Sequence, residues 1–208
     1  MTYAVKDIFF TLQGEGAQSG RAAVFCRFAG CNLWSGLEAD RAMAVCRFCD
    51  TDFVGADAGR FATAEVLAEA VPRRWPNEIG GVPLVVCTGG VPLLQLDEAL
   101  CAAFRRNGFD VAVETNGTQP APPGIDWLTV SPKAGAKLVV AAGDELKLVY
   151  PQAGAPPESF AGLAFRHFFL QPMDGPDRQA NSEAAAAYCL AHPLWRLGLQ
   201  MHKIVGLP

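Results

Sequence analysis

The sequence predicts an α/β fold, more closely a partial, open (β/α) barrel with about six parallel strands, three long helices and one long inserted loop. Apolar runs typical of buried strands alternate with stretches that have apolar residues at helical spacing. Most of these runs end in glycine or a polar residue, as expected for parallel strands that approach a ligand at their carboxyl ends. Three long helices are too few to close an eight-fold barrel.

Length and composition favour one domain. The chain has 208 residues, of which 50% are hydrophobic and 18% are charged. Such a chain is long enough to bury a full core and too apolar to be disordered. Because the sequence contains neither an internal repeat nor a linker-like stretch, we expect residues 1–208 to form a single domain.

The first elements are two strands joined by a glycine-rich loop. The apolar run at residues 5–12 predicts a strand that ends in a loop at Gly14 and Gly16. The spacing of these glycines differs from the GxGxxG fingerprint, which disfavours a dinucleotide site of the Rossmann type. The second strand covers Ala22 to Phe28 and leads directly to the first of three clustered cysteines.

Predicted strands and helices follow one another along the rest of the chain. Between Cys31 and Cys46 the sequence is compatible with a short helix or with a mobile loop. Thr63 is expected to cap a helix that Pro72 ends. The elements that follow are a strand at 82–90, a helix from Gln95 to Asn107 closed by Gly108, a strand at 109–117, strands near 126–130 and 145–150, a strand at 165–175, a helix at 181–192 capped by Asn181 or Ser182, and a final strand from Trp195 with a short tail.

Charge and hydropathy exclude several classes of partner. The net charge is -4, which disfavours binding of nucleic acid through its phosphates and makes a small molecule the default ligand. No apolar run approaches the ~20 residues that span a bilayer, so we expect no membrane association and a soluble, cytoplasmic protein. Cysteines stay reduced in that compartment. Four of them lie in apolar runs and are expected to be small buried hydrophobes: Cys26, Cys87, Cys101 and Cys189.

The other three cysteines, Cys31, Cys46 and Cys49, point to a metal centre. Fourteen residues separate the first two and only two separate the second two. A short turn directs the sulfurs of a CxxC pair to one side. Zinc sites usually need a second close pair, which is missing here, whereas three thiolates can hold three corners of an iron-sulfur cubane and leave one iron open. Spacing favours the cluster, with zinc and inert thiols as alternatives.

Polar residues follow most of the predicted strands. If the strands are parallel, these residues surround one cavity at the carboxyl ends of the sheet, where glycines also allow close approach of a ligand to the backbone. His202 follows the last strand and is expected to add a polar contact, while His167 and His192 are expected to be structural. The strand-end residues are Gln13, Glu15, Arg27, Thr88, Gly89, Gly90, Glu114, Asn116, Ser131, Lys133 and Gln171.

The cysteine pattern and the order of several motifs resemble a known family. A set of three cysteines ending in CRFC, followed by a Gly-Gly strand exit, resembles the radical S-adenosylmethionine superfamily. The motifs QGEG, RFAGCNLW, CDT, TGG, ETNGT, SPK and QPMDG, in this order over nearly the whole chain, are similar to those of the 7-carboxy-7-deazaguanine synthase family. The CRFC turn alone is moderately specific, and the ordered set is highly specific.

The resemblance implies a lyase that contracts a pterin ring. Members of the family use a [4Fe-4S] cluster, S-adenosylmethionine as a regenerated cofactor and Mg2+ to convert 6-carboxy-5,6,7,8-tetrahydropterin to 7-carboxy-7-deazaguanine, with loss of ammonia, in queuosine biosynthesis. An external, flavodoxin-like electron donor and a homodimer are also implied. No catalytic residue beyond the cluster and the cofactor is expected.

The resemblance also assigns roles to individual residues. The cluster ligands would be Cys31, Cys46 and Cys49, and Thr51 would bind Mg2+. The substrate site would contain Leu12, Gln13, Gly14, Glu15, Arg27, Thr88, His202 and Pro208, with the Arg27 fork suited to the substrate carboxylate. The cofactor site would contain Phe48, Gly90, Glu114, Ser131, Lys133, Gln171, Pro172, Met173 and Asp174.

Two departures from the family pattern affect the cofactor site. The first gap of the cysteine motif usually has three residues, so the fourteen here imply an insertion in the cluster-binding loop. The usual Gly-Gly-Glu-Pro exit has Val91 in place of glutamate, so a carboxylate for the cofactor ammonium is missing. Two other functions stay open from sequence: a radical activase that forms a glycyl radical on a partner protein, and a zinc-stabilised binding module.

Overall fold

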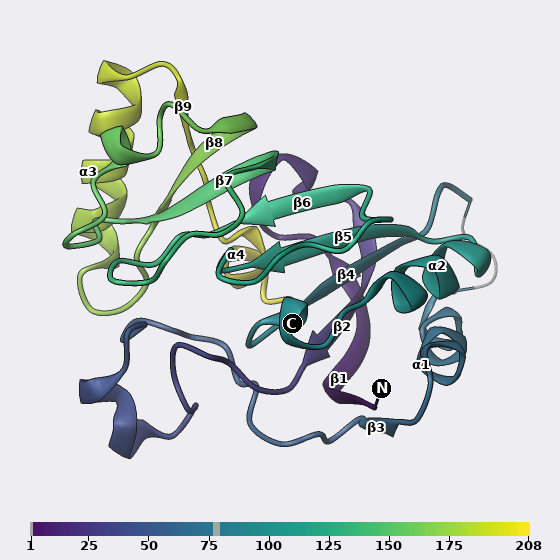
Figure 1. Ribbon diagram of the computed structural model, residues 1–208. Helices are drawn as coiled ribbons and strands as arrows, with labels where there is room; N and C mark the ends of the chain where they lie inside the picture. Colours follow the sequence, from purple (N-terminus) through teal and green to yellow (C-terminus); the bar gives the residue numbers. More distant parts are fainter. Residues whose placement is uncertain (1, 77–79) are drawn as a thin grey trace.

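A computed structural model describes residues 2–76 and 80–208, and its centre is one nine-stranded sheet (Figure 1). The strands lie in the order β3-β1-β2-β4-β5-β6-β7-β8-β9. Because this order is linear, the sheet curves without closing, as predicted for an open barrel. The strands are β1 Tyr3–Leu12, β2 Ala22–Phe28, β3 Gly59–Phe61, β4 Leu84–Gly89, β5 Asp110–Thr115, β6 Trp127–Val130, β7 Ala142–Tyr150, β8 Ala164–Pro172 and β9 Trp195–Leu197.

The parallel part of the sheet runs from β2 to β9. Each neighbouring pair in this part is parallel, which agrees with the predicted α/β class. β1 is antiparallel to β2, with Leu12 opposite Ala22. The expectation that all strand exits share one edge is therefore wrong for β1, because a short loop between consecutive strands produces an antiparallel pair. The loop after β1 lies beside the amino end of β2.

The first two helices begin with side-chain caps. The helices are α1 Ala64–Ala70, α2 Glu98–Arg106, α3 Arg178–Ala191 and α4 Met201–Val205. Thr63 accepts a hydrogen bond from the Val66 amide (3.3 Å), which confirms the predicted cap of α1, and α1 ends before Pro72. The predicted start of α2 at Gln95 is wrong, because Asp97 caps the helix. The Gln95 side chain instead bonds the backbone of Ala4.

The last third of the chain differs most from the prediction. α3 begins at Arg178, so neither Asn181 nor Ser182 is its cap. Asn181 instead donates to the Met173 carbonyl (2.9 Å). The residues after β9, expected to be a tail, form the short helix α4, which ends at Gly206 in the left-handed conformation (φ 71°). No helix within the described ranges is long and apolar enough to cross a membrane.

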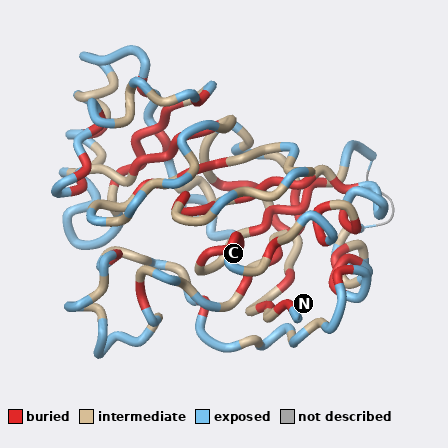
Figure 2. The backbone as a smooth tube through the Cα atoms, in the orientation of Figure 1, coloured by how far each residue is buried: buried red, intermediate tan, exposed pale blue. Residues whose placement is uncertain are grey.

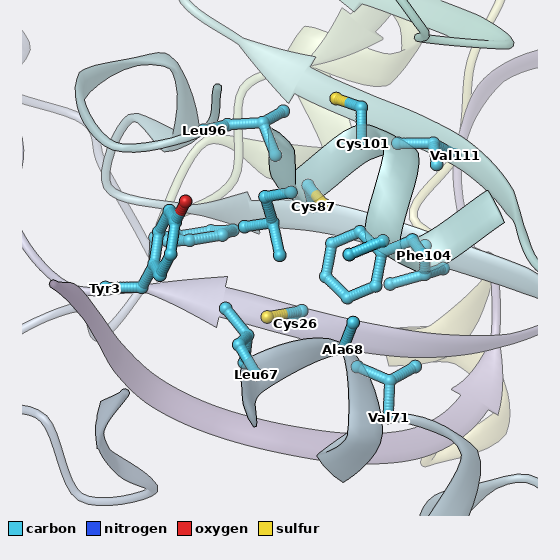
Figure 3. Close-up of a cluster of buried hydrophobic side chains, with 14 of the residues drawn as sticks. Tyr3, Cys26, Leu67, Ala68, Val71, Cys87, Leu96, Cys101, Phe104 and Val111 are labelled. Atoms are coloured by element: carbon cyan, nitrogen blue, oxygen red, sulfur yellow. The ribbon is translucent and has the colours of Figure 1, made fainter. Parts of the chain in front are cut away.

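Most of the core lies on the helix-covered face of the sheet, and a smaller cluster of Ala23, Leu84, Val86 and Ala112 packs on the opposite face. In Figure 2 the central strands are mostly buried, whereas the long excursion after β2 is mostly exposed. Side chains of β1, β2, β4 and β5 pack with those of α1 and α2 in one cluster, and α3 covers β8 and β9 in a second. Figure 3 shows Cys26, Cys87 and Cys101 in the first cluster. All three are fully buried, which confirms the expectation that they are buried hydrophobes, and burial raises the pKa of each thiol. The same expectation is wrong for Cys189, which is only half-buried because it packs at the edge of the second cluster.

Candidate active site

One cavity of about 470 Å³ contains every residue predicted to bind substrate, cofactor or metal. The strands explain how distant residues meet there. Side chains alternate between the two faces of a strand, so Val24, Cys26 and Phe28 enter the core while Arg27 faces the cavity. The same alternation in β4, β5, β7 and β8 directs Thr88, Glu114, Lys147 and Gln171 to the cavity.

The loop after β1 reaches this cavity from the opposite end of the sheet. Gln13 donates from Nε2 to Glu114 Oε1 (2.8 Å), and Glu15 pairs with Lys147. Gly14 is packed against the His202 ring so closely that a Cβ atom would overlap it. These contacts bring the predicted substrate residues of the loop together with His202, although β1 is antiparallel.

Two carboxylates beside this loop carry opposite pKa shifts. Burial alone would raise the pKa of Glu15, but the charge and hydrogen bond of Lys147 outweigh it and lower the pKa to about 2. Burial raises the pKa of Glu145 to about 7, with Lys147 opposing the shift. Glu145 accepts a hydrogen bond from the Ala17 amide (2.8 Å) and lies against Gly16, whose φ of 66° favours glycine. Glu15 is thus ionised at neutral pH, and Glu145 is partly protonated.

The three clustered cysteines border the same cavity as free thiols. The Cys46 thiol hydrogen-bonds to the Cys49 sulfur, which lowers the pKa of Cys49 to about 6 and raises that of Cys46. The Leu33 amide lies 3.4 Å from the Cys31 sulfur. A thiolate-favouring environment at Cys49 and an amide donor to the Cys31 sulfur suit iron-sulfur ligation.

The cysteine arrangement also bears on the zinc alternative. Among residues 2–76 and 80–208, no three His, Cys, Asp or Glu side chains converge as the ligands of a single metal ion would. Three thiolates at the separate corners of a cubane need no such convergence. The donor set therefore fits a [4Fe-4S] cluster better than a tetrahedral zinc ion.

The insertion between Cys31 and Cys46 contains one short 3-10 helix, Glu38–Met43. In Figure 1 this excursion, in blue, extends away from the sheet. Arg41 organises it, because its guanidinium stacks 4.0 Å from the Trp34 ring and donates to the carbonyls of Arg47 (2.9 Å) and Cys49 (3.1 Å). Of the two conformations left open by the sequence, the structure contains the short helix.

The β4 exit packs directly on the cysteine loop. A Cβ atom at Gly90 would overlap the Gly30 carbonyl, so only glycine allows this approach. The Val91 amide donates to the same carbonyl (3.0 Å), and the Val91 side chain is fully buried in the core. The position at which the family pattern has a carboxylate is therefore outside the cavity.

Arg27 has a partner that the sequence did not suggest. Its Nη1 donates to Asp7 Oδ2 (2.9 Å), and its guanidinium lies 5.2 Å from the centroid of the Phe9 ring. Arg27 Nε is buried and has no hydrogen-bond partner among the described residues. A buried donor of this kind at a cavity wall suits an anionic ligand group.

The C-terminal segment forms part of the cavity wall through Gln200, His202, Lys203 and Pro208. Lys203 Nζ bridges Asp50 and Asp174, at 2.6 Å from each carboxylate. Gln200 Nε2 donates to Glu15 (3.0 Å), and the Met201 amide donates to the Gly14 carbonyl (2.8 Å). Lys203 and Gln200 were absent from the predicted site, because their position depends on the unpredicted helix α4. Asp50, which directly follows Cys49, was also absent, because its partners Gln200 and Lys203 belong to that segment.

Lys147 is a buried cavity residue that the sequence reasoning missed. It lies in β7, and its side chain is 5% exposed. The sequence contains a signal for it: Leu146 and Leu148 are core residues, so alternation places Lys147 on the cavity face together with Glu145. A lysine between two core leucines is a candidate for a paired, functional cation.

Comparisons with known proteins extend over the whole chain. No protein-family model matches the sequence. The 7-carboxy-7-deazaguanine synthase of Caulobacter vibrioides is 64% identical over 213 residues, and that of Bordetella pertussis is 64% identical over 211, each alignment covering 100% of both chains. The crystal structure of QueE from Escherichia coli superposes with a TM-score of 0.72 at 27% identity, covering 97% of this chain and 95% of that one. The chain therefore belongs to the 7-carboxy-7-deazaguanine synthase family.

Proposed function

We propose that the protein converts 6-carboxy-5,6,7,8-tetrahydropterin to 7-carboxy-7-deazaguanine with loss of ammonia, as a radical S-adenosylmethionine lyase. The observation that carries the proposal is one cavity in which three free thiols meet the polar inner face of a parallel sheet, in a chain similar over its full length to synthases of that name. When bound, the [4Fe-4S] cluster and S-adenosylmethionine supply a carbon-centred radical that takes a hydrogen atom from the pterin.

The pterin would lie between the loop after β1 and the C-terminal segment. Arg27 would bind the substrate carboxylate, since its fork matches two oxygens and its Nε lacks a partner among the described residues. The ionised Glu15 would accept hydrogen bonds from the guanidine-like edge of the ring. Leu12, Gln13, Gly14, Thr88, His202 and Pro208 line the same end of the site.

The cofactor would lie beside the cysteine loop. Lys133 Nζ donates to Ser131 Oγ (2.7 Å) and lies 5.9 Å from the centroid of the Phe48 ring, which forms a polar wall with an aromatic edge. Because the Val91 side chain is in the core, backbone carbonyls near Gly90 would meet the cofactor ammonium in place of a carboxylate. Glu114, Gln171, Pro172, Met173 and Asp174 complete this end.

Magnesium binding would depend on Thr51. This residue follows the cysteine loop and lines the cavity. One hydroxyl is a weak Mg2+ ligand, so substrate oxygens and water would complete an octahedron. Thr51→Ala is then expected to reduce the response of activity to added Mg2+, and an unchanged magnesium titration would contradict this role.

Further features of the family are proposed on separate grounds. The one continuous nine-stranded sheet supports a single domain. The seven cysteines are free thiols, which suits the reducing cytoplasm. A homodimer and an external, flavodoxin-like electron donor are proposed from the family resemblance.

The activase is the less favoured alternative. Its site must admit a polypeptide, whereas here the C-terminal segment is fastened to Asp50, Asp174 and Glu15. The relatives compared above carry the synthase name and match the whole chain.

An anaerobic assay distinguishes the two functions. Reconstituted protein is incubated with reductant, S-adenosylmethionine, the carboxytetrahydropterin and Mg2+, and the product is analysed by mass spectrometry. The synthase yields a product lighter than the substrate by the elements of ammonia, with S-adenosylmethionine regenerated. Absence of pterin consumption, together with a glycyl radical on an added partner protein, would reverse the assignment.

A further inference from the structure

Lys147 contacts both ends of the proposed active site at once. Its ammonium pairs with Glu15, which belongs to the loop after β1, and with Glu114 Oε2 of β5 (2.9 Å). Within residues 2–76 and 80–208, these two carboxylates have no other cationic partner. One buried ammonium therefore balances a carboxylate at the proposed pterin end and another at the proposed cofactor end.

The three charged groups are joined into a closed ring by Gln13. The Glu15 amide donates to Gln13 Oε1 (3.1 Å), and Gln13 Nε2 donates to Glu114 Oε1 (2.8 Å). Lys147 completes the ring through its contacts to both carboxylates. Neither carboxylate can move without stretching a contact to the shared ammonium.

Electrostatics keep this ring charged. Burial works against the Lys147 ammonium, but the Glu114 and Glu15 charges outweigh it and raise its pKa above the ordinary lysine value. Glu15 stays ionised because its pKa is about 2. Stability alone does not explain these buried charges, because a protein with a buried ion pair is often no more stable than one with apolar residues of similar volume in its place. All three side chains also border the cavity.

We propose that Lys147 is a positioning residue that couples the two ends of the site, so that binding of the pterin and binding of S-adenosylmethionine strengthen each other. A ligand that immobilises Glu15 also fixes Glu114 through the shared ammonium, and the second ligand then meets an ordered carboxylate. The inference rests on the proposed function, from which it takes the two ligands.

Calorimetry on anaerobically reconstituted protein without reductant tests the coupling. The pterin is titrated in the absence and in the presence of S-adenosylmethionine. We expect the cofactor to lower the Kd of the pterin about fivefold or more in the wild type. Lys147→Met should bring this ratio close to one. Lys137→Met, at an exposed lysine outside the cavity, is the matched control and should keep the wild-type ratio.

Two isosteric variants give a second test that does not depend on the folding of Lys147→Met. Glu15→Gln and Glu114→Gln each remove one charge and keep the side-chain shape. If Lys147 couples the ends, each variant weakens binding of both ligands. The inference is overturned, and the proposed function is not, by either of two results. One is a variant that weakens only the ligand at its own end of the site. The other is a wild-type protein whose Kd for the pterin is the same with and without S-adenosylmethionine. A wild-type protein that binds no pterin overturns the proposed function as well.

Discussion

Cys46 has the clearest consequence of any single residue in the proposed site. Cys46 borders the cavity and is 5% exposed. Without it, two thiolates remain, which cannot hold three corners of a cubane. Cys46→Ala should therefore lose the broad visible absorption of the reconstituted cluster and all cleavage of S-adenosylmethionine. Cys189→Ala, outside the cavity, should keep both, and retained cleavage in Cys46→Ala would refute the ligand assignment.

Glu145 is a buried carboxyl group whose charge should change near neutral pH. Its pKa is raised to about 7 by burial, above the ordinary value of 4.5. Between these two values the folded protein holds a proton that the unfolded chain has lost, so stability falls as pH rises from about 4.5 to about 7. The slope from this group reaches about 1.4 kcal/mol per pH unit.

Glu145→Gln tests this pH dependence. The amide oxygen can still accept from Ala17, and no charge can develop. We expect chemical denaturation at several pH values to give a free energy of unfolding that decreases less steeply across this window than in the wild type. Equal slopes for the two proteins would show that Glu145 is ionised throughout.

Two ion pairs hold the helix α4 against other parts of the cavity wall. Lys203 holds it to the cysteine loop through Asp50 and to the β8 exit through Asp174. Partly exposed ion pairs are worth roughly 0.2–1 kcal/mol each. Because Lys203→Met removes two such pairs, it should speed dissociation of the pterin about two- to thirtyfold in stopped-flow measurements, with little change in melting temperature.

The control for this prediction lies on the same helix. Ile204 is 68% exposed, and Ile204→Ala should leave the dissociation rate unchanged. If Lys203→Met dissociates as slowly as the wild type, the ion pairs do not hold the segment closed.

Patterns within short stretches of sequence correctly predicted several strands and one helix cap. The apolar runs of β4, β5 and β8 and the Thr63 cap of α1 are correct, because strand alternation and capping depend on a few adjacent residues. The start of α3 was wrong because Asn181, a good capping residue by type, bonds Met173 in a distant loop. Tertiary contacts of that kind are invisible in a local pattern.

The candidate site likewise contains residues that the sequence predicted and residues that it did not. Motif order predicted the residues that line the cavity, and the structure brings them together. Lys147, Gln200 and Lys203 were missed, because each depends on a partner more than thirty positions away or on the unpredicted helix α4. The direction of β1 was also missed. A loop of nine residues after Leu12 reverses the chain, so β1 and β2 are antiparallel.

The nine-stranded sheet has two edge strands, β3 and β9. Within the described ranges, β3 pairs only with β1 and β9 only with β8. Exposed leucines accompany the β9 edge: Leu190 (86%), Leu194 (50%), Leu197 (39%) and Leu199 (49%). An unpaired strand edge with exposed apolar side chains beside it is a candidate contact with another chain.

Light scattering coupled to size-exclusion chromatography tests the proposed homodimer. The expected mass is twice the 22.1 kDa of one chain. Leu190→Asp should shift the protein toward the monomer if this edge forms the contact. Val66→Asp, on the distant helix α1 and 50% exposed, serves as the control. A monomeric wild type would contradict the proposal.

The hydrogen bond from the Met201 amide to the Gly14 carbonyl joins residues 187 positions apart (201 minus 14). Loop-closure entropy must be paid before a contact over such a separation forms, so we expect this contact to form late in folding. The sheet and the cysteine loop should therefore be assembled before the cavity is closed. During that interval the three thiols are open to solvent, so the order of folding itself provides a period in which a cluster can be delivered. Pulse-labelling hydrogen exchange should show protection of the β4 and β5 amides before that of Met201.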